Sequence, residues 1–150
     1  MIDEAIHKLT AIVTEYPDRF QNIPQAEFSF KPSPQKWSKK EILGHLIDSA
    51  TNNHQRFIRA QFEDKPTIYY DQDMWVYYNH YNEMASNQLI HFWTAYNLQL
   101  IEVMKRIPGE NLMRQCKMRD GNYLTLDYLV NDYVVHLQHH LDQIFNSKDF

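Results

Sequence analysis

The chain has 150 residues, with 15 Lys and Arg against 19 Asp and Glu, which gives a net charge of −4 when the histidines are neutral. This length corresponds to one domain, and the lack of a basic excess disfavours a general nucleic-acid binder. Only three glycines and one cysteine occur, which excludes glycine-rich nucleotide loops, a disulfide framework and a multi-cysteine zinc site. No apolar run approaches the roughly 18 residues of a membrane span, and no secretory signal is present. A cytoplasmic protein is therefore expected.

The first predicted element is an amphipathic helix over residues 2–16, where apolar residues recur at intervals of three and four. Pro17 is expected to end it. Three further prolines follow before residue 36, so a loop or extended crossing is predicted over 17–36.

The second predicted helix begins with a strong start signal. Ser38 and Glu41 have the spacing of a capping box, in which each side chain bonds the other residue's backbone amide. Apolar spacing typical of a helix then continues to about residue 62, and Pro66 closes the segment.

An aromatic connection follows over residues 67–82, and part of it, 74–80, is expected to form a short helix. Its Tyr and Trp residues at 69–81 are open to three interpretations, namely a substrate lid, a dimer face or core packing, of which packing is the most frequent. A long helix is predicted over 86–106, with Phe92 in its apolar stripe.

The last part of the chain is predicted as a loop over 110–124 followed by a helix that reaches Asn146. Asp120 and Gly121 suggest a turn, and Thr125 is expected to be the N-cap of the helix. Four substantial helices with little strand predict an all-α fold, a four-helix bundle with long connections, as one domain over residues 1–150. In such bundles, sites are built from inward side chains of facing helices.

A histidine pair on the last helix gives the clearest chemical signal. His136 and His140 are four residues apart, which places their Cβ atoms about 5–6 Å apart on one helical face, where they can share a divalent ion. Leu137 stands where a zinc protease has its glutamate, so no general base lies between the histidines. His45, early in the second helix, is the leading candidate for a third ligand. A hydrogen-bonded or exposed helix face remains the alternative.

Three polar residues near these histidines are candidates for supporting roles. Asp132 and Gln143 share one stripe with the histidine pair, and Asp48 lies one turn after His45. Asp48 or Asp132 could hold the second ring nitrogen of a ligand or meet a bound water, and Asp132 could also act as a base, a fourth ligand or a solvated surface carboxylate. Three imidazoles favour Zn²⁺ or Ni²⁺ over Fe²⁺ or Mn²⁺.

Two segments together resemble the DinB-like superfamily. Residues 37–50, WSKKEILGHLIDSA, resemble the opening helix of that family, and residues 136–144, HLQHHLDQI, resemble its closing His-x-x-His-His element. The resemblance implies that His45, His136 and His140 are a metal triad. It also implies a four-helix bundle, often a homodimer, that uses zinc or nickel. Members include thiol S-transferases, a mycothiol-dependent isomerase and many proteins described as metal-dependent hydrolases.

The function expected from the residues and the resemblance is a divalent-metal-dependent enzyme. It would be a thiol S-transferase using a low-molecular-weight thiol, or a hydrolase, acting on a small electrophilic molecule. The alternative is a non-catalytic metal- or ligand-binding module of a stress response. A nucleic-acid partner is disfavoured by the charge, and a catalytic role for Cys116 is disfavoured because no base is placed for it.

Overall fold

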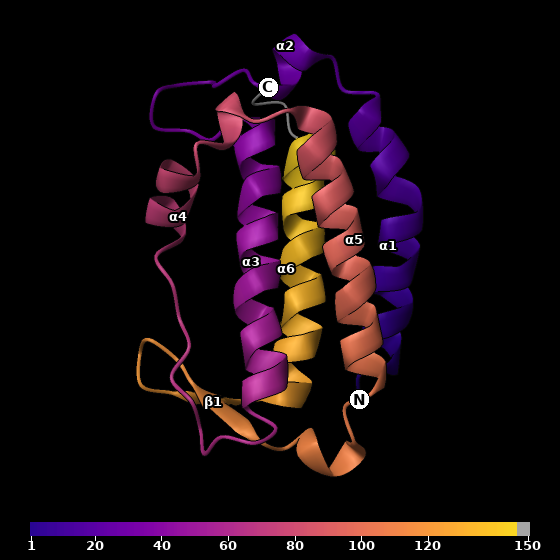
Figure 1. The fold of residues 1–150 in the computed structure, drawn as a ribbon, viewed down its shortest axis with the longest axis vertical. Helices are drawn as coiled ribbons and strands as arrows, with labels where there is room; N and C mark the ends of the chain where they lie inside the picture. Colours follow the sequence, from indigo (N-terminus) through magenta and orange to yellow (C-terminus); the bar gives the residue numbers. More distant parts are fainter. Residues whose placement is uncertain (147–150) are drawn as a thin grey trace.

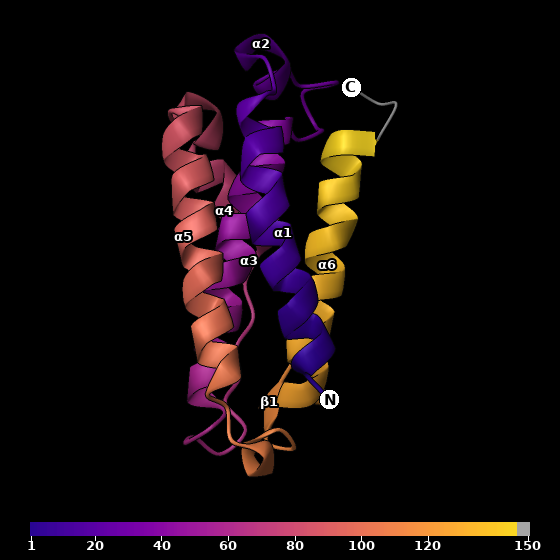
Figure 2. The ribbon, with the colours of Figure 1, turned by 90° about the vertical axis from the view of Figure 1, so that its right-hand side faces the viewer.

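Four long helices lie side by side in the computed structural model, which describes residues 1–146 (Figures 1 and 2). They are α1 (Asp3–Gln21), α3 (Lys39–Arg59), α5 (Ser86–Lys105) and α6 (Leu126–Asn146). Helices α1 and α3 each pack against both α5 and α6, so α1 and α3 occupy opposite corners. The expected all-α four-helix bundle is confirmed.

The connections carry shorter elements. Helix α2 (Gln25–Phe28) follows α1, and helix α4 (Gln72–Asn79) and the 3₁₀ turn η1 (Tyr81–Glu83) lie between α3 and α5. After α5 come a second 3₁₀ turn, η2 (Gly109–Asn111), and strands β1 (Gln115–Lys117) and β2 (Tyr123–Thr125), which pair antiparallel. The prediction of an unstructured loop over 110–124 was therefore wrong in part, because a three-residue strand is too short to show a periodic pattern.

The expectation that Pro17 ends the first helix was also wrong. Proline inside a helix costs about 3 kcal/mol, yet α1 continues through it to residue 21. The extension buries Phe20 completely, and its ring contacts those of Phe28, Trp93 and Phe145. Burial of such a side chain contributes about 1.5–3 kcal/mol, and each aromatic pair about 0.5–1.5 kcal/mol more, so packing offsets the proline.

The capping box predicted at the start of the second helix is confirmed in α3. The Ser38 hydroxyl accepts a hydrogen bond from the Glu41 amide at 3.0 Å, and the Glu41 carboxylate accepts one from the Ser38 amide, also at 3.0 Å. The helix ends at residue 59 rather than near 62, and Phe62 is 69% exposed. Because this cap fixes the first turn of α3, it also fixes where His45 stands, two turns further on.

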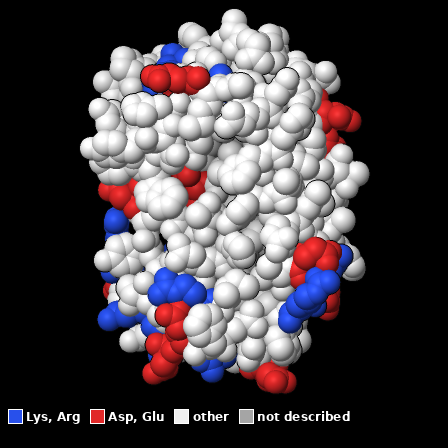
Figure 3. Space-filling view, in the orientation of Figure 1, with Lys and Arg blue, Asp and Glu red and all other residues white. Residues whose placement is uncertain are grey.

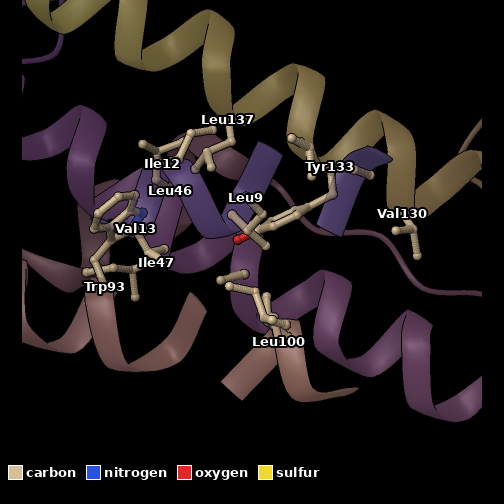
Figure 4. Close-up of a cluster of buried hydrophobic side chains, with 14 of the residues drawn as sticks. Leu9, Ile12, Val13, Leu46, Ile47, Trp93, Leu100, Val130, Tyr133 and Leu137 are labelled. Atoms are coloured by element: carbon tan, nitrogen blue, oxygen red, sulfur yellow. The ribbon is translucent and has the colours of Figure 1, made fainter. Parts of the chain in front are cut away.

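The core fills the space between the four long helices (Figure 4). Trp93 from α5, Tyr133 from α6 and Leu9 from α1 are among its largest fully buried side chains. Phe92, predicted in the apolar stripe, is instead 49% exposed, whereas Ile101 is buried. The reason is that α5 packs against two helices, α1 and α3. The side of α5 that is buried between them therefore differs from the single apolar stripe inferred from the spacing.

Charged side chains are sparse on the face shown in Figure 3, where most of them lie toward its edges and lower end. The helix in front, α5, has no charged residue between Glu83 and Glu102. Within residues 1–146, no helix is both long and apolar enough to cross a membrane.

Candidate metal centre

Three histidines converge between α3 and α6. These helices pack against each other in opposite directions, so the first turns of α3 face the last turns of α6 (Figure 1). The Nε2 atoms of His45 and His136 lie 3.3 Å apart, and those of His136 and His140 lie 3.1 Å apart. One ligand atom from each histidine lies within 4.8 Å of the other two. The sequence-predicted triad is therefore brought together in space.

The spacing of these nitrogens fits a shared ion. Zinc–nitrogen bonds are about 2.0–2.1 Å long, so two ligands of a tetrahedral site lie about 3.3 Å apart. The two Nε2–Nε2 distances that involve His136, 3.3 and 3.1 Å, are close to this value. Three imidazoles leave a fourth position open, which is the arrangement of catalytic rather than structural zinc sites.

Gln143 sets the tautomer of one candidate ligand. Its side-chain oxygen Oε1 lies 2.9 Å from Nδ1 of His140. A carbonyl oxygen can only accept, so the His140 proton is on Nδ1 and the lone pair of Nε2 points toward the cluster. Gln143 thus occupies the supporting position that the sequence suggested for it.

Burial keeps the three imidazoles neutral. Together with the smaller effect of the positive charges that His140 and His136 would carry, it lowers the pKa of His45 to about 3. Burial and the neighbouring His140 lower the pKa of His136 to about 4, and burial also lowers the pKa of His140. Metal ligation requires neutral imidazole, so the site is ready to bind an ion at neutral pH.

Asp48 is buried one turn below His45 in α3. Its Oδ1 atom accepts a 2.5 Å hydrogen bond from the Tyr81 hydroxyl and a 3.3 Å bond from Nδ2 of Asn79. Its Oδ2 atom is buried without a hydrogen-bond partner. Burial raises the pKa of this carboxyl to about 6, against the hydrogen bond from Tyr81, which lowers it. At pH 7.5 Asp48 is therefore mostly ionised.

Tyr81 reaches Asp48 because Gly44 leaves room for its ring. A Cβ atom on Gly44 would lie within 3.0 Å of three ring carbons of Tyr81. The sequence pattern did not predict a role for Tyr81 or Asn79 at the site. A glycine inside a strongly patterned helix, directly before a candidate ligand, was the signal that could have indicated a close approach.

Asp132 does not join the cluster. Its side chain is exposed, and no oxygen of it lies among the converging ligand atoms. Burial lowers the pKa of the half-buried Arg56, and the negative charge of Asp132 opposes this in small part. The structure agrees with the solvated-carboxylate alternative and gives no support to a fourth ligand or a base at this position.

A pocket of about 300 Å³ adjoins the histidine cluster. Trp37 lines it, and the Trp37 ring lies 5.0 Å from the ring of His45; Gln143, the partner of His140, lines it too. The other lining residues come from the loop before α3 and from the start of α4: Pro32, Gln35, Lys36, Gln72 and Asp73. The aromatic segment 69–81 therefore borders this pocket through α4 and supports Asp48 through its far end.

Cys116 is fully buried in β1, and burial raises the pKa of its thiol. A buried thiol with a raised pKa is a poor nucleophile. This agrees with the expectation that Cys116 has no catalytic role.

Comparison with known proteins gives a consistent picture. A sequence profile of the DinB superfamily matches residues 8–144. A protein of Halalkalibacterium halodurans, named provisionally as a metal-dependent hydrolase, is 21% identical over 137 residues, covering 88% of this chain and 80% of that protein.

Two solved structures share the fold. YfiT from Bacillus subtilis, described as a probable metal-dependent hydrolase with an unusual four-helix bundle topology, superposes with a TM-score of 0.87 at 18% identity, over 96% of this chain and 83% of that chain. The mycothiol-dependent maleylpyruvate isomerase superposes with a TM-score of 0.72 at 12% identity, over 95% of this chain and 60% of that chain. This chain thus spans well under two thirds of the isomerase.

Proposed function

The chain belongs to the DinB superfamily, and from this premise we propose that it is a divalent-metal-dependent enzyme whose ion is held by His45, His136 and His140. One observation carries the proposal: three neutral imidazoles on two helices bring their ring nitrogens within 4.8 Å of one another, and the two separations that involve His136, 3.3 and 3.1 Å, are close to those of a tetrahedral ion. A relative and a structural neighbour are both described as metal-dependent hydrolases, which supports it.

We propose Zn²⁺ or Ni²⁺ as the ion, because a set of three imidazole nitrogens suits these ions better than Fe²⁺ or Mn²⁺. Bound there, the ion would lower the pKa of a water or thiol at its open position. The protein's part is to hold three neutral ligands, so that the full positive charge of the ion is kept. The ring of Trp37 lies against the site on the side of His45, 5.0 Å from the His45 ring.

The proposed reaction is transfer of a low-molecular-weight thiol to a small electrophile, and hydrolysis is the second candidate reaction. A pocket of about 300 Å³ has the size of a small-molecule site. Within it, Lys36 and Asp73 offer one charge of each sign and Trp37 an apolar surface, a combination that suits a small molecule with both polar and apolar parts. The description of a structural neighbour as mycothiol-dependent supports a thiol as one reactant.

Metal content tests the site directly. Elemental analysis of the purified, tag-free protein should give about one equivalent of zinc or nickel, and the His136→Ala variant should give none while its helical circular dichroism is kept. His139→Ala is the matched control, since His139 is exposed on the same helix and outside the cluster. Stoichiometric metal in His136→Ala would contradict the triad.

Activity assays then separate the candidate reactions. The metal-loaded protein is offered a small electrophile with and without a panel of low-molecular-weight thiols, and with ester substrates. Thiol-dependent consumption of the electrophile supports the transferase, and thiol-independent cleavage supports the hydrolase. No metal in the wild type, even after reloading with zinc or nickel, would favour the non-catalytic binding module.

We also propose that the protein is cytoplasmic and that it is a homodimer, the latter as the family resemblance implies. Phe92 and Leu98 lie on α5, which has no charged residue before Glu102, and each is about half exposed, at 49% and 51%; this supports a partner at α5. Light scattering should give twice the chain mass of 18.1 kDa. A mass of one chain at micromolar concentration would contradict the dimer.

A further inference from the structure

Two complementary polar atoms are left without partners beside the histidine cluster. Nδ1 of His45 and Oδ2 of Asp48 are both buried and make no hydrogen bond. His45 is fully buried and Asp48 is 2% exposed, so water does not reach them easily. A buried polar atom that lacks a partner costs about 1–3 kcal/mol, and proteins rarely keep two such atoms without a reason.

The two atoms lie on adjacent turns of one helix. Residues three apart on an α-helix share a face, and each side chain leans toward the turn before its own Cα. Asp48 therefore leans toward the turn that carries His45. Tyr81 and Asn79 both donate to the other oxygen, Oδ1, which holds the carboxylate in place and leaves Oδ2 available.

The charge of Asp48 also lacks compensation. Within residues 1–146, no Lys, Arg or His side chain forms an ion pair with it; its two donors, Tyr81 and Asn79, are neutral. A buried carboxylate is normally paired with a positive group. A divalent ion on His45 would supply that charge one helical turn away.

Resting on the function proposed above, we propose that Asp48 is a positioning residue: its Oδ2 accepts the Nδ1 proton of His45 and so directs the Nε2 lone pair of His45 to the ion. The bond requires a turn of one of the two side chains, because the atoms are unpaired in this structure. Gln143 does the same for His140 from α6. Tyr81 and Asn79 then form a further layer that orients Asp48.

Zinc affinity and the protons of the imidazole rings test this role. Competition with a chelator of known affinity should show Asp48→Ala binding zinc 10–100-fold more weakly than the wild type, the usual loss for such supporting partners. Asp48→Asn keeps an oxygen acceptor and should fall between the two. Asn52→Ala is the matched control, since Asn52 is similarly buried one turn further on and its side chain donates to the backbone oxygen of Asp48. The zinc affinity of this variant should equal that of the wild type.

A spectroscopic signature separates positioning from a general loss of fold. In the zinc-loaded wild type, NMR of the histidine rings should show a protected Nδ1 proton on His45. This resonance should disappear in Asp48→Ala, shift upfield in Asp48→Asn and stay unchanged in Asn52→Ala. If Asp48→Ala does not fold, Asp48→Asn carries the test alone, because it preserves the shape of the side chain.

The outcomes distinguish this inference from the proposed function. Wild-type protein that binds no metal overturns both. Suppose instead that the wild type binds metal and His136→Ala abolishes the binding. The role of Asp48 alone is then overturned if Asp48→Ala binds zinc within twofold of the wild type, or if the His45 resonance is unchanged in Asp48→Asn.

Discussion

Replacing Gly44 by alanine sets two well-defined effects against each other. In an exposed helix interior, this change stabilises by about 1 kcal/mol, because alanine has the higher helix propensity. In α3 the new methyl group would instead lie within 3.0 Å of three ring carbons of Tyr81. That ring is buried and its hydroxyl is bonded to Asp48, so it cannot simply swing into solvent.

The magnitudes favour the clash. Forcing an extra carbon into a packed interior costs about 1–3 kcal/mol. If the Tyr81 ring moves aside, its hydrogen bond to the ionised Asp48 is also lost, and bonds to charged groups contribute about 1.5–3 kcal/mol. After subtracting the gain of about 1 kcal/mol in helix propensity, Gly44→Ala should lower the free energy of unfolding by about 1.5–5 kcal/mol.

Urea denaturation of the metal-free protein measures this difference, with circular dichroism as the probe and a common m value as the check on two-state unfolding. Two backgrounds separate the contributions. In Tyr81→Phe the ring remains without its hydroxyl. Gly44→Ala should then destabilise by about 1.5–3 kcal/mol less than in the wild type, because the hydrogen bond is already gone. In Tyr81→Ala the ring is absent, and Gly44→Ala should stabilise by about 1 kcal/mol.

A single result would refute the reasoning. If Gly44→Ala stabilises the wild-type protein as it would an isolated helix, the Tyr81 ring does not lie against α3, and the support of Asp48 by Tyr81 fails with it.

The remaining predictions concern the site and its surroundings. Gln143→Ala should weaken zinc binding about 10–100-fold in chelator competition, because His140 loses the acceptor that fixes its tautomer; unchanged affinity would remove Gln143 from the site. The pKa values of His45 and His136, lowered to about 3 and about 4, mean that below pH 6.5 the unfolded chain binds protons that the folded chain does not. The metal-free protein should therefore lose stability as the pH falls from about 6.5 toward 4, with the raised pKa of Asp48, about 6, offsetting part of the loss; urea midpoints across this range measure it, and a flat profile would show that the histidines are not buried neutral. Cys116→Ser should lower the free energy of unfolding by about 1–3 kcal/mol through a buried hydroxyl, while metal stoichiometry stays at the wild-type value; loss of metal would contradict the assignment of ligands.

The long helices were predictable because periodicity and caps act locally. The capping box at Ser38 and the N-cap at Thr125, whose hydroxyl accepts from the Tyr128 amide at 3.2 Å, are both as expected from the sequence. The errors arose where tertiary contacts decide. Pro17 is tolerated because distant rings bury Phe20, and sequence spacing does not reveal those rings.

The candidate ligands were predictable for a different reason. His136 and His140 share a helical face by spacing alone, whereas His45 was placed with them by its polar neighbours and by resemblance. Their meeting depends on the antiparallel packing of α3 and α6, which the sequence does not give directly. Tyr81 escaped prediction because a segment without periodicity carries it to α3, and only Gly44 hinted at its position.

The cluster also carries an internal conflict that an ion resolves. The Nε2 atom of His140 presents a lone pair, since its proton is on Nδ1 facing Gln143. His136 can donate its Nε2 proton to His140, but then that proton also faces His45. If Nε2 of His45 also carries a proton, two N–H groups face each other and Nδ1 of His45 is left without a donor. If Nε2 of His45 accepts instead, its proton is on Nδ1, which has no acceptor. Every proton arrangement leaves a buried group unsatisfied, whereas a cation accepts three lone pairs at once. The metal-free site therefore weakens the bundle, and apolar residues of similar volume would pack there with less cost. Side chains that reduce stability in this way are expected where binding, rather than folding, has selected them.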